Sequence, residues 1–131
     1  MLTLSTFAKD SIDYAFSFKN QKLQPINYSK SFYAIIIQEQ CPACTGVYSM
    51  MEKPVKSEHK IYLSAIYEPS KRWMGRHSKY TAKYDVYSTG NLIKEKEHYP
   101  KATPALYFWD AGLKKGSIQY GISPIAKILK D

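Results

Sequence analysis

Residues 32–44 read Phe-Tyr-Ala-Ile-Ile-Ile-Gln-Glu-Gln-Cys-Pro-Ala-Cys, and no other stretch of the chain is as informative. The run from Phe32 to Ile37 is apolar on both faces, as expected of a central strand buried on two sides. Pro42, directly after the first cysteine, is favoured at the first position of a helix. The stretch therefore predicts a strand over residues 31–38 that leads through a turn into a short helix over residues 42–53.

The spacing of the cysteines indicates chemistry rather than a structural crosslink. The chain has only two cysteines, and a disulfide that closes so short a loop removes little chain entropy. A reactive pair or half of a zinc site are the alternatives. Zinc needs two further ligands, and the only histidines, His59, His77 and His98, form no compact pair and are interpreted as surface residues. We therefore favour a redox pair and expect no metal and no cofactor.

The position of the pair at the start of a helix gives each cysteine a role. Unpaired N–H groups and the helix dipole stabilise an anion at a helix N-terminus. For Cys41 that anion is the thiolate, which is the nucleophilic form. Cys44 follows almost one turn later on the same face, within disulfide reach. The sequence thus predicts an attacking thiol followed by a resolving thiol.

The segments on either side alternate between strand and helix patterns. Upstream, residues 13–28 predict a hairpin, because Tyr14, Phe16 and Phe18 alternate with smaller or polar residues. Downstream, the pattern predicts a strand at 60–67, a helix at 71–77 capped by Ser70, a short strand at 83–87, a helix at 89–99, a hairpin at 105–109 and 117–120, and a last helix opened by Ser123 and Pro124. Strands separated by helices imply crossover connections, so we expect an α/β fold with a mixed sheet.

Length and charge limit the classes of function. The 131 residues correspond to one domain over residues 1–131, and the net charge of +8 allows an acidic partner or simply solubility. Residues 70–83 interleave basic and aromatic side chains: Lys71, Arg72, Arg76, Lys79 and Lys83 with Trp73 and Tyr80. Such a pattern suits single-stranded nucleic acid, an acidic protein, or a solvated helix with its aromatic residues in the core. We favour the solvated helix and do not expect a nucleic-acid partner.

The compartment is not fixed by the sequence. No apolar run is long enough to span a membrane, and the N-terminus lacks a basic segment followed by an apolar one. The expected location is periplasmic or otherwise extracytoplasmic if a leader has been removed, and cytoplasmic if not. The oligomeric state is likewise open.

Several motifs together resemble the thioredoxin superfamily over most of the chain. They are the hairpin that begins with Asp13-Tyr14-Ala15-Phe16, the strand before Cys41, the pair Thr103-Pro104 with the strand and turn at 105–112, and Gly121 before the last helix. The chain is most similar to the thioredoxin-like thiol–disulfide oxidoreductases related to the reductases of cytochrome c maturation and to redoxins. The resemblance implies a thioredoxin-like fold with an N-terminal β-hairpin and exchange of disulfides with protein substrates.

The resemblance also implies a substrate-binding surface. Pro104 is expected to be cis and to face the cysteines, with Thr103 lending backbone groups to a substrate strand beside Pro42. Two departures distinguish this chain: Gln40 stands where many relatives carry a tryptophan, and apolar residues occupy the preceding strand where relatives often have a buried acid. Glu39 is the nearest carboxylate and is the candidate proton acceptor for Cys44.

We interpret the protein as an enzyme, a thiol–disulfide oxidoreductase. The alternative is a thioredoxin-fold binding or structural module that uses a basic aromatic surface without turnover. The direction of catalysis, whether reduction, oxidation or isomerisation, depends on the potential of the dithiol against its compartment rather than on any single residue.

Overall fold

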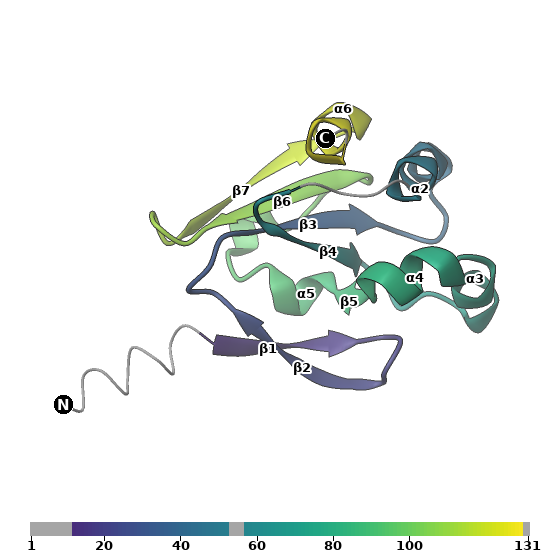
Figure 1. The fold of residues 1–131 in the computed structure, drawn as a ribbon, viewed down its shortest axis with the longest axis horizontal. Helices are drawn as coiled ribbons and strands as arrows, with labels where there is room; N and C mark the ends of the chain where they lie inside the picture. Colours follow the sequence, from purple (N-terminus) through teal and green to yellow (C-terminus); the bar gives the residue numbers. More distant parts are fainter. Residues whose placement is uncertain (1–11, 53–56, 130–131) are drawn as a thin grey trace.

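The computed structural model describes residues 12–52 and 57–129, which build a seven-stranded mixed sheet with helices packed against it (Figure 1). The strands are β1 (Ile12–Ser17), β2 (Lys22–Asn27), β3 (Phe32–Ile37), β4 (Lys60–Ala65), β5 (Tyr87–Ser88), β6 (Ala105–Asp110) and β7 (Lys115–Tyr120). The helices are α2 (Thr45–Met51), α3 (Lys71–Arg76), α4 (Ser78–Tyr84), α5 (Thr89–Leu92) and α6 (Ile122–Leu129), with 3₁₀ helices η1 (Pro42–Cys44) and η2 (Lys96–His98).

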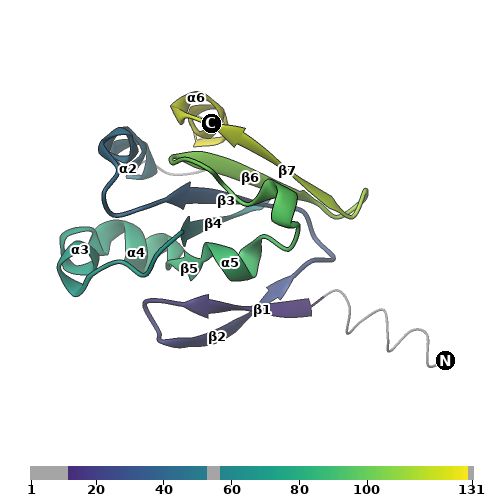
Figure 2. The same ribbon diagram turned by 180° about the vertical axis from the view of Figure 1, so that it is seen from behind.

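The strand order confirms the predicted mixed α/β architecture. The order across the sheet is β2-β1-β5-β4-β3-β6-β7. β3 pairs in parallel with β4 and antiparallel with β6, and the chain crosses between β3 and β4 through α2. The β1–β2 hairpin forms one edge and the β6–β7 hairpin forms the other, as both ribbon views show (Figures 1 and 2). The predicted N-terminal β-hairpin is thus present.

The central strand β3 separates two hydrophobic cores. Ile35 and Ile37 point into a core to which α2, α3 and α6 contribute Val47, Trp73 and Ile125. The alternate side chains of β3, namely Phe32, Ala34 and Ile36, belong to a second core that includes Leu92 of α5. β3 is buried on both faces because each face is covered, which explains its continuous apolar sequence.

Two predictions between residues 83 and 99 were wrong. The strand over residues 83–87 begins later, because Lys83 and Tyr84 still belong to α4, which the sequence reading missed. Asp85 then turns the chain with a positive φ of 58°, and its carboxylate accepts hydrogen bonds from the Ser17 hydroxyl at 2.8 and 3.0 Å. This contact with β1 is made between segments far apart in the sequence, so no local pattern reports it.

The helix expected over residues 89–99 is interrupted. The α-helix ends at Leu92, Ile93 is extended with φ −96° and ψ 112°, and η2 follows. Ile93 is buried in the second core, and the Lys94 ammonium pairs with the Asp13 carboxylate of β1 at 2.7 Å. Tertiary contacts therefore override the helical pattern here. No helix in the described part of the chain has the length and apolar character needed to cross a bilayer.

Candidate active site

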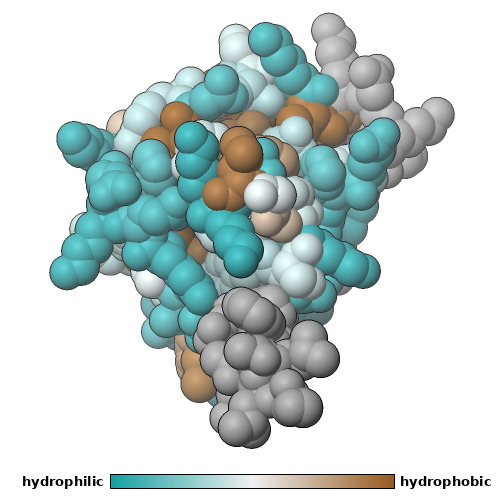
Figure 3. Space-filling model, turned by 90° about the vertical axis from the view of Figure 1, so that its left-hand side faces the viewer, coloured by the Kyte–Doolittle hydropathy of each residue, from teal (hydrophilic) through white to brown (hydrophobic). Residues whose placement is uncertain are grey.

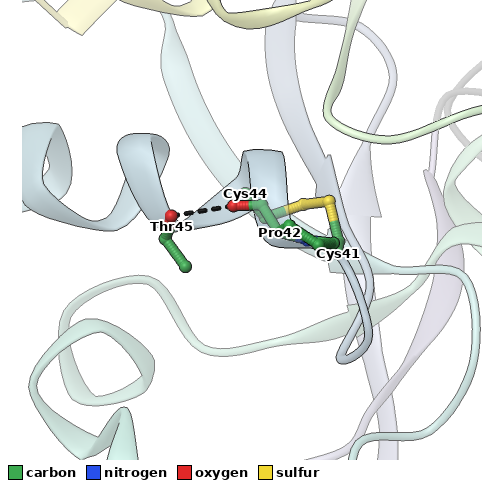
Figure 4. The surroundings of a disulfide bond; sticks show 4 residues. All are labelled: Cys41, Pro42, Cys44 and Thr45. Carbon is green, nitrogen blue, oxygen red and sulfur yellow. Dashed lines mark hydrogen bonds between the residues drawn. A yellow bond between two sulfur atoms is a disulfide. The ribbon is translucent and has the colours of Figure 1, made fainter.

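The two cysteines lie where β3 ends and the next helix begins, and they are joined by a disulfide bond with a Cα–Cα distance of 5.3 Å (Figure 4). Cys41 is extended, with φ −145° and ψ 92°, and is the N-cap of η1, in which Pro42 is the first residue. The Cys44 amide donates to the Cys41 carbonyl at 2.9 Å, and the Thr45 hydroxyl donates to the Pro42 carbonyl at 2.8 Å. The turn runs directly into α2, as the proline predicts.

Burial distinguishes the two sulfur-bearing residues. Cys44 is fully buried in the core that includes Val47, whereas Cys41 is half-buried at the margin of the same core. Pro42 between them is exposed. A partner molecule therefore meets Cys41 first, and Cys44 is reached only from within the protein.

The Thr103–Pro104 segment lies at the same end of the strands as the dithiol, beside the carboxyl end of β3. β6 starts at Ala105, which pairs with Ile36 near the end of β3, so the residues just before β6 lie beside the segment that leads to Cys41. The Thr103–Pro104 peptide bond is cis, and the buried Pro104 accepts a hydrogen bond from the Gly121 amide at 2.9 Å. Within the described ranges, 12–52 and 57–129, the half-exposed Thr103 makes no hydrogen bond, so its backbone groups are available to a ligand.

Glu39 makes contacts that argue against its predicted role as proton acceptor for Cys44. Its carboxylate accepts one hydrogen bond from the Ser70 amide at 2.8 Å and another from the Ser70 hydroxyl at 2.7 Å. These bonds hold the pKa of Glu39 below its ordinary value, and the charge of Arg76 lowers it further. A carboxylate with a lowered pKa is a weaker base. The structure instead makes Glu39 a link between the end of β3 and the start of α3.

Ser70 is central to this link, because it is also the N-cap of α3, as the sequence predicted. Its hydroxyl oxygen accepts from the Trp73 amide at 3.1 Å. We expect Ser70→Ala to lower the free energy of unfolding by about 1 kcal/mol, since both the cap and a bond to Glu39 are lost. Urea denaturation measures this. Ser78→Ala is the control, because the Ser78 hydroxyl makes no hydrogen bond in the described chain; a loss as large as that of Ser70→Ala would contradict the assignment.

The lowered pKa of Glu39 predicts a pH-dependent contribution to stability. The folded-state pKa lies below the ordinary value of 4.5, so the ionised carboxylate stabilises the folded protein above that value. The stabilisation is lost as the pH falls through the folded-state pKa. We therefore expect Glu39→Gln to lower Tm above about pH 5, and to match the parent protein only once the pH is below the folded-state pKa. Glu58→Gln, which alters an exposed carboxylate, should leave Tm unchanged throughout.

A cluster of aromatic rings that the sequence reading missed connects α2 with α3 and α4. The His77 ring lies 4.5 Å from the Tyr48 ring, 4.6 Å from the Trp73 ring and 5.6 Å from the Tyr80 ring. His77 is half-buried among these rings; burial lowers its pKa, and the charge of Arg76 lowers it further. The helical spacing of Trp73, His77 and Tyr80 was the available signal.

No cluster of three or more His, Cys, Asp or Glu side chains able to hold a metal ion occurs among the residues that the structure describes. His77 in particular faces aromatic rings.

Comparison with known proteins relates the fold to solved structures. No protein-family model and no curated protein matches this chain. A secreted disulfide oxidoreductase of Mycobacterium tuberculosis, homologous to E. coli DsbE, is 12% identical with a TM-score of 0.54, over 90% of this chain and 94% of that one. The pneumococcal exposed lipoprotein thioredoxin of Streptococcus pneumoniae is 15% identical with a TM-score of 0.58, over 91% and 98%.

A third solved structure agrees with these two. StoA from Bacillus subtilis is 12% identical with a TM-score of 0.56, and the match covers 95% of this chain and 99% of StoA. At such identities the likeness concerns the backbone, and it extends over nearly the whole of each protein. The chain has a thioredoxin-like fold.

Proposed function

We propose that the protein is a thiol–disulfide oxidoreductase that acts on protein substrates through Cys41 and Cys44. The observation that carries the proposal is the unequal burial of two bonded cysteines at the end of β3, one half-exposed and one fully buried. A disulfide between residues three positions apart contributes little to stability, so its presence at the end of β3 favours a chemical role. The solved thiol–disulfide oxidoreductases of the same fold support the same reading.

The reaction follows from the accessibility of each sulfur. In the reducing direction, the Cys41 thiolate attacks one sulfur of a substrate disulfide, forming a mixed disulfide and releasing the other substrate sulfur as a thiolate. The released substrate thiolate then takes the proton of the Cys44 thiol. The resulting Cys44 thiolate attacks the Cys41 sulfur. The second substrate sulfur leaves as a thiolate that takes up a proton from solvent, so the substrate is released as a dithiol. Cys41 and Cys44 are left as the disulfide. Two electrons pass to the substrate, and an external dithiol restores the protein.

The substrate is held by backbone groups in this proposal. The amide and carbonyl of Thr103 make no hydrogen bond with any other described residue. Thr103 precedes β6 at the end of the sheet where Cys41 lies. An extended substrate segment can bond to those groups while its cysteine meets Cys41. The exposed Pro42 and the buried Pro104 shape the two sides of this contact. Thr103, Pro104 and Pro42 are therefore proposed as binding residues, not as reacting groups.

The compartment belongs to the proposal as well. The Mycobacterium tuberculosis protein is described as secreted, and the Streptococcus pneumoniae protein is an exposed lipoprotein. Disulfide chemistry persists outside the reducing cytoplasm. We therefore propose an extracytoplasmic location.

Thiol alkylation followed by mass spectrometry tests the function. The protein is equilibrated with dithiothreitol buffers of graded potential and then alkylated, so that each free thiol adds one label. We expect a two-electron transition in which both cysteines gain or lose reactivity together. A pair that stays unlabelled at every potential, or that fails to reduce a peptide disulfide when reduced, would contradict the proposal and leave the binding-module alternative.

A further inference from the structure

A strongly basic surface covers α3. Residues 69–84 contain five Lys or Arg residues and no Asp or Glu. Lys71, Arg72 and Arg76 of α3 are all exposed, and in the described part of the chain none of the three forms an ion pair. We call these three residues the basic face. It differs from the rest of the segment, because Lys79 is paired with Glu52 at 3.1 Å.

The basic face lies next to the dithiol. The Ser70 amide, which directly precedes Lys71, bonds to the Glu39 carboxylate at 2.8 Å, and Glu39 is two residues before Cys41. Two residues of extended chain span at most about 7 Å, so Lys71 and Cys41 are within reach of one short peptide. Both ribbon views place α3 at the same end of the molecule as the start of α2 (Figures 1 and 2).

Two acidic groups, Glu39 and Glu68, lie near the basic face. Both carboxylate oxygens of Glu39 accept hydrogen bonds from Ser70. The carboxylate of Glu68 accepts a hydrogen bond from the side-chain amide of Gln21 at 3.4 Å. Both carboxylates keep their negative charge, so Glu39 and Glu68 oppose the basic face in part. Together with Lys19, the three cations of the basic face still leave this surface with a net positive charge. The opposite end of the molecule is mostly hydrophilic and has only small, separate hydrophobic areas (Figure 3).

A shallow groove borders the basic face and can receive an extended segment. Its volume is about 610 Å³, and it lies between the β1–β2 turn and the start of α3. Phe18, Pro69 and Met74 supply apolar lining. Lys19 and Lys71 bring two positive charges against the one negative charge of Glu68. Tyr67, which precedes the groove residue Glu68, is 72% exposed and offers a ring to the same segment.

Trp73, the aromatic residue between the basic side chains of α3, is not available for stacking on bases. Trp73 is only 6% exposed, and its ring packs against Tyr48 and His77 at centroid distances of 6.0 and 4.6 Å. Single-stranded nucleic acid is bound by successive exposed rings together with positive charge, and of Tyr67 and Trp73 beside the basic face only Tyr67 is exposed. The surface therefore fits an acidic protein segment better than a nucleic acid.

We propose that Lys71, Arg72 and Arg76 form a docking surface for substrate proteins that carry an acidic segment close to the reacting cysteine. This inference rests on the proposed function, since it assigns the class of substrate that the dithiol meets. The acidic segment lies along α3 and the groove while the substrate cysteine approaches Cys41. Attraction between opposite charges raises the rate of encounter and weakens as salt is added.

Paired peptides test the docking surface. Two synthetic peptides contain the same disulfide and differ only in the residues beside it, glutamates in one and glutamines in the other. The fully reduced protein is mixed with each, and the rate of peptide reduction in a single turnover is measured at low and high ionic strength. We expect the glutamate peptide to react roughly tenfold faster at low ionic strength, and the advantage to fall toward unity at high ionic strength.

The variant Lys71→Glu/Arg72→Glu should abolish or reverse that preference. Acidic residues are favourable in the first turn of a helix, so α3 is expected to remain folded. The ratio of the two peptide rates cancels any change in the reactivity of the Cys41 thiolate itself. Lys30→Glu is the matched control, because Lys30 is exposed between β2 and β3 at the far end of the central strand; it should keep the parent ratio.

Three results would overturn the inference in distinguishable ways. Equal rates for both peptides with the parent protein would show that the basic face does not select acidic substrates, while dithiol exchange stands. Equal rates together with binding of a single-stranded oligonucleotide that Lys71→Glu/Arg72→Glu abolishes would assign the face to nucleic acid. Failure to reduce either peptide would remove the proposed function and the inference together.

Discussion

Replacing Cys44 with serine is expected to turn the protein into a covalent trap for its substrates. Cys41 can still attack a substrate disulfide, but the buried thiol that would release the mixed disulfide is gone. We expect the mixed disulfide to accumulate to near completion and turnover to fall by a factor of roughly a thousand or more. Non-reducing electrophoresis and intact mass spectrometry after incubation with a peptide disulfide measure both effects.

The matched variant Cys41→Ser separates the two cysteine roles. It removes the half-exposed nucleophile and leaves only the buried thiol, so neither a mixed disulfide nor turnover is expected. Equal trapping by the two variants would mean that either sulfur can attack. Trapping by Cys41→Ser alone would reverse the assignment of attacking and resolving residues, and in both cases the burial argument would be wrong.

Gly116→Ala is expected to destabilise the protein more than any other single-methyl addition at a described glycine. A Cβ atom at Gly116 would overlap the ring and hydroxyl of Tyr107, which is fully buried. Tyr107 donates to one oxygen of Glu95 at 2.8 Å, and the Gly116 amide donates to the other at 2.7 Å. The ring cannot move without breaking this arrangement, so we expect a loss of about 3 kcal/mol in the free energy of unfolding.

Urea denaturation measures the loss of stability in Gly116→Ala. In thermal denaturation we expect Tm to fall by roughly 10 °C. Gly75→Ala is the control for adding a methyl group. A Cβ atom there meets nothing within 4 Å, and Gly75 lies within α3, where alanine is the better helix former. We expect this control to be neutral or to stabilise by about 0.5–1 kcal/mol. A Gly116→Ala protein as stable as the parent would show that the Tyr107 pocket relaxes readily.

The elements nearest the dithiol were the most predictable from sequence. The apolar run of β3, the proline after Cys41 and the Ser70 cap are local signals, and the structure has the corresponding strand, helix start and capped helix. Each depends on residues within a few positions of one another. Local chemistry was therefore enough to foresee where the cysteines lie relative to the central strand.

The features that escaped prediction depend on distant contacts. The Glu39 carboxylate is held by a residue 31 positions away, and Asp85 is held by Ser17 over a separation of 68. The interrupted helix after residue 89 reflects the burial of Ile93 and the pairing of Lys94 with β1. The roles of Thr103, Pro104 and Pro42 in binding a substrate stay predictions, because they concern a partner rather than the fold.

The bond between Glu39 and Ser70 has a consequence for exchanging parts between proteins of this fold. It ties the loop that delivers Cys41 to the loop that begins α3, so the two loops are not independent modules. Transplanting residues 66–70 from a relative without a hydroxyl at position 70 is expected to release the carboxylate and loosen the approach to the dithiol. Substrate specificity and the reactivity of the dithiol should therefore be transferred together, by moving both loops into the recipient protein at once.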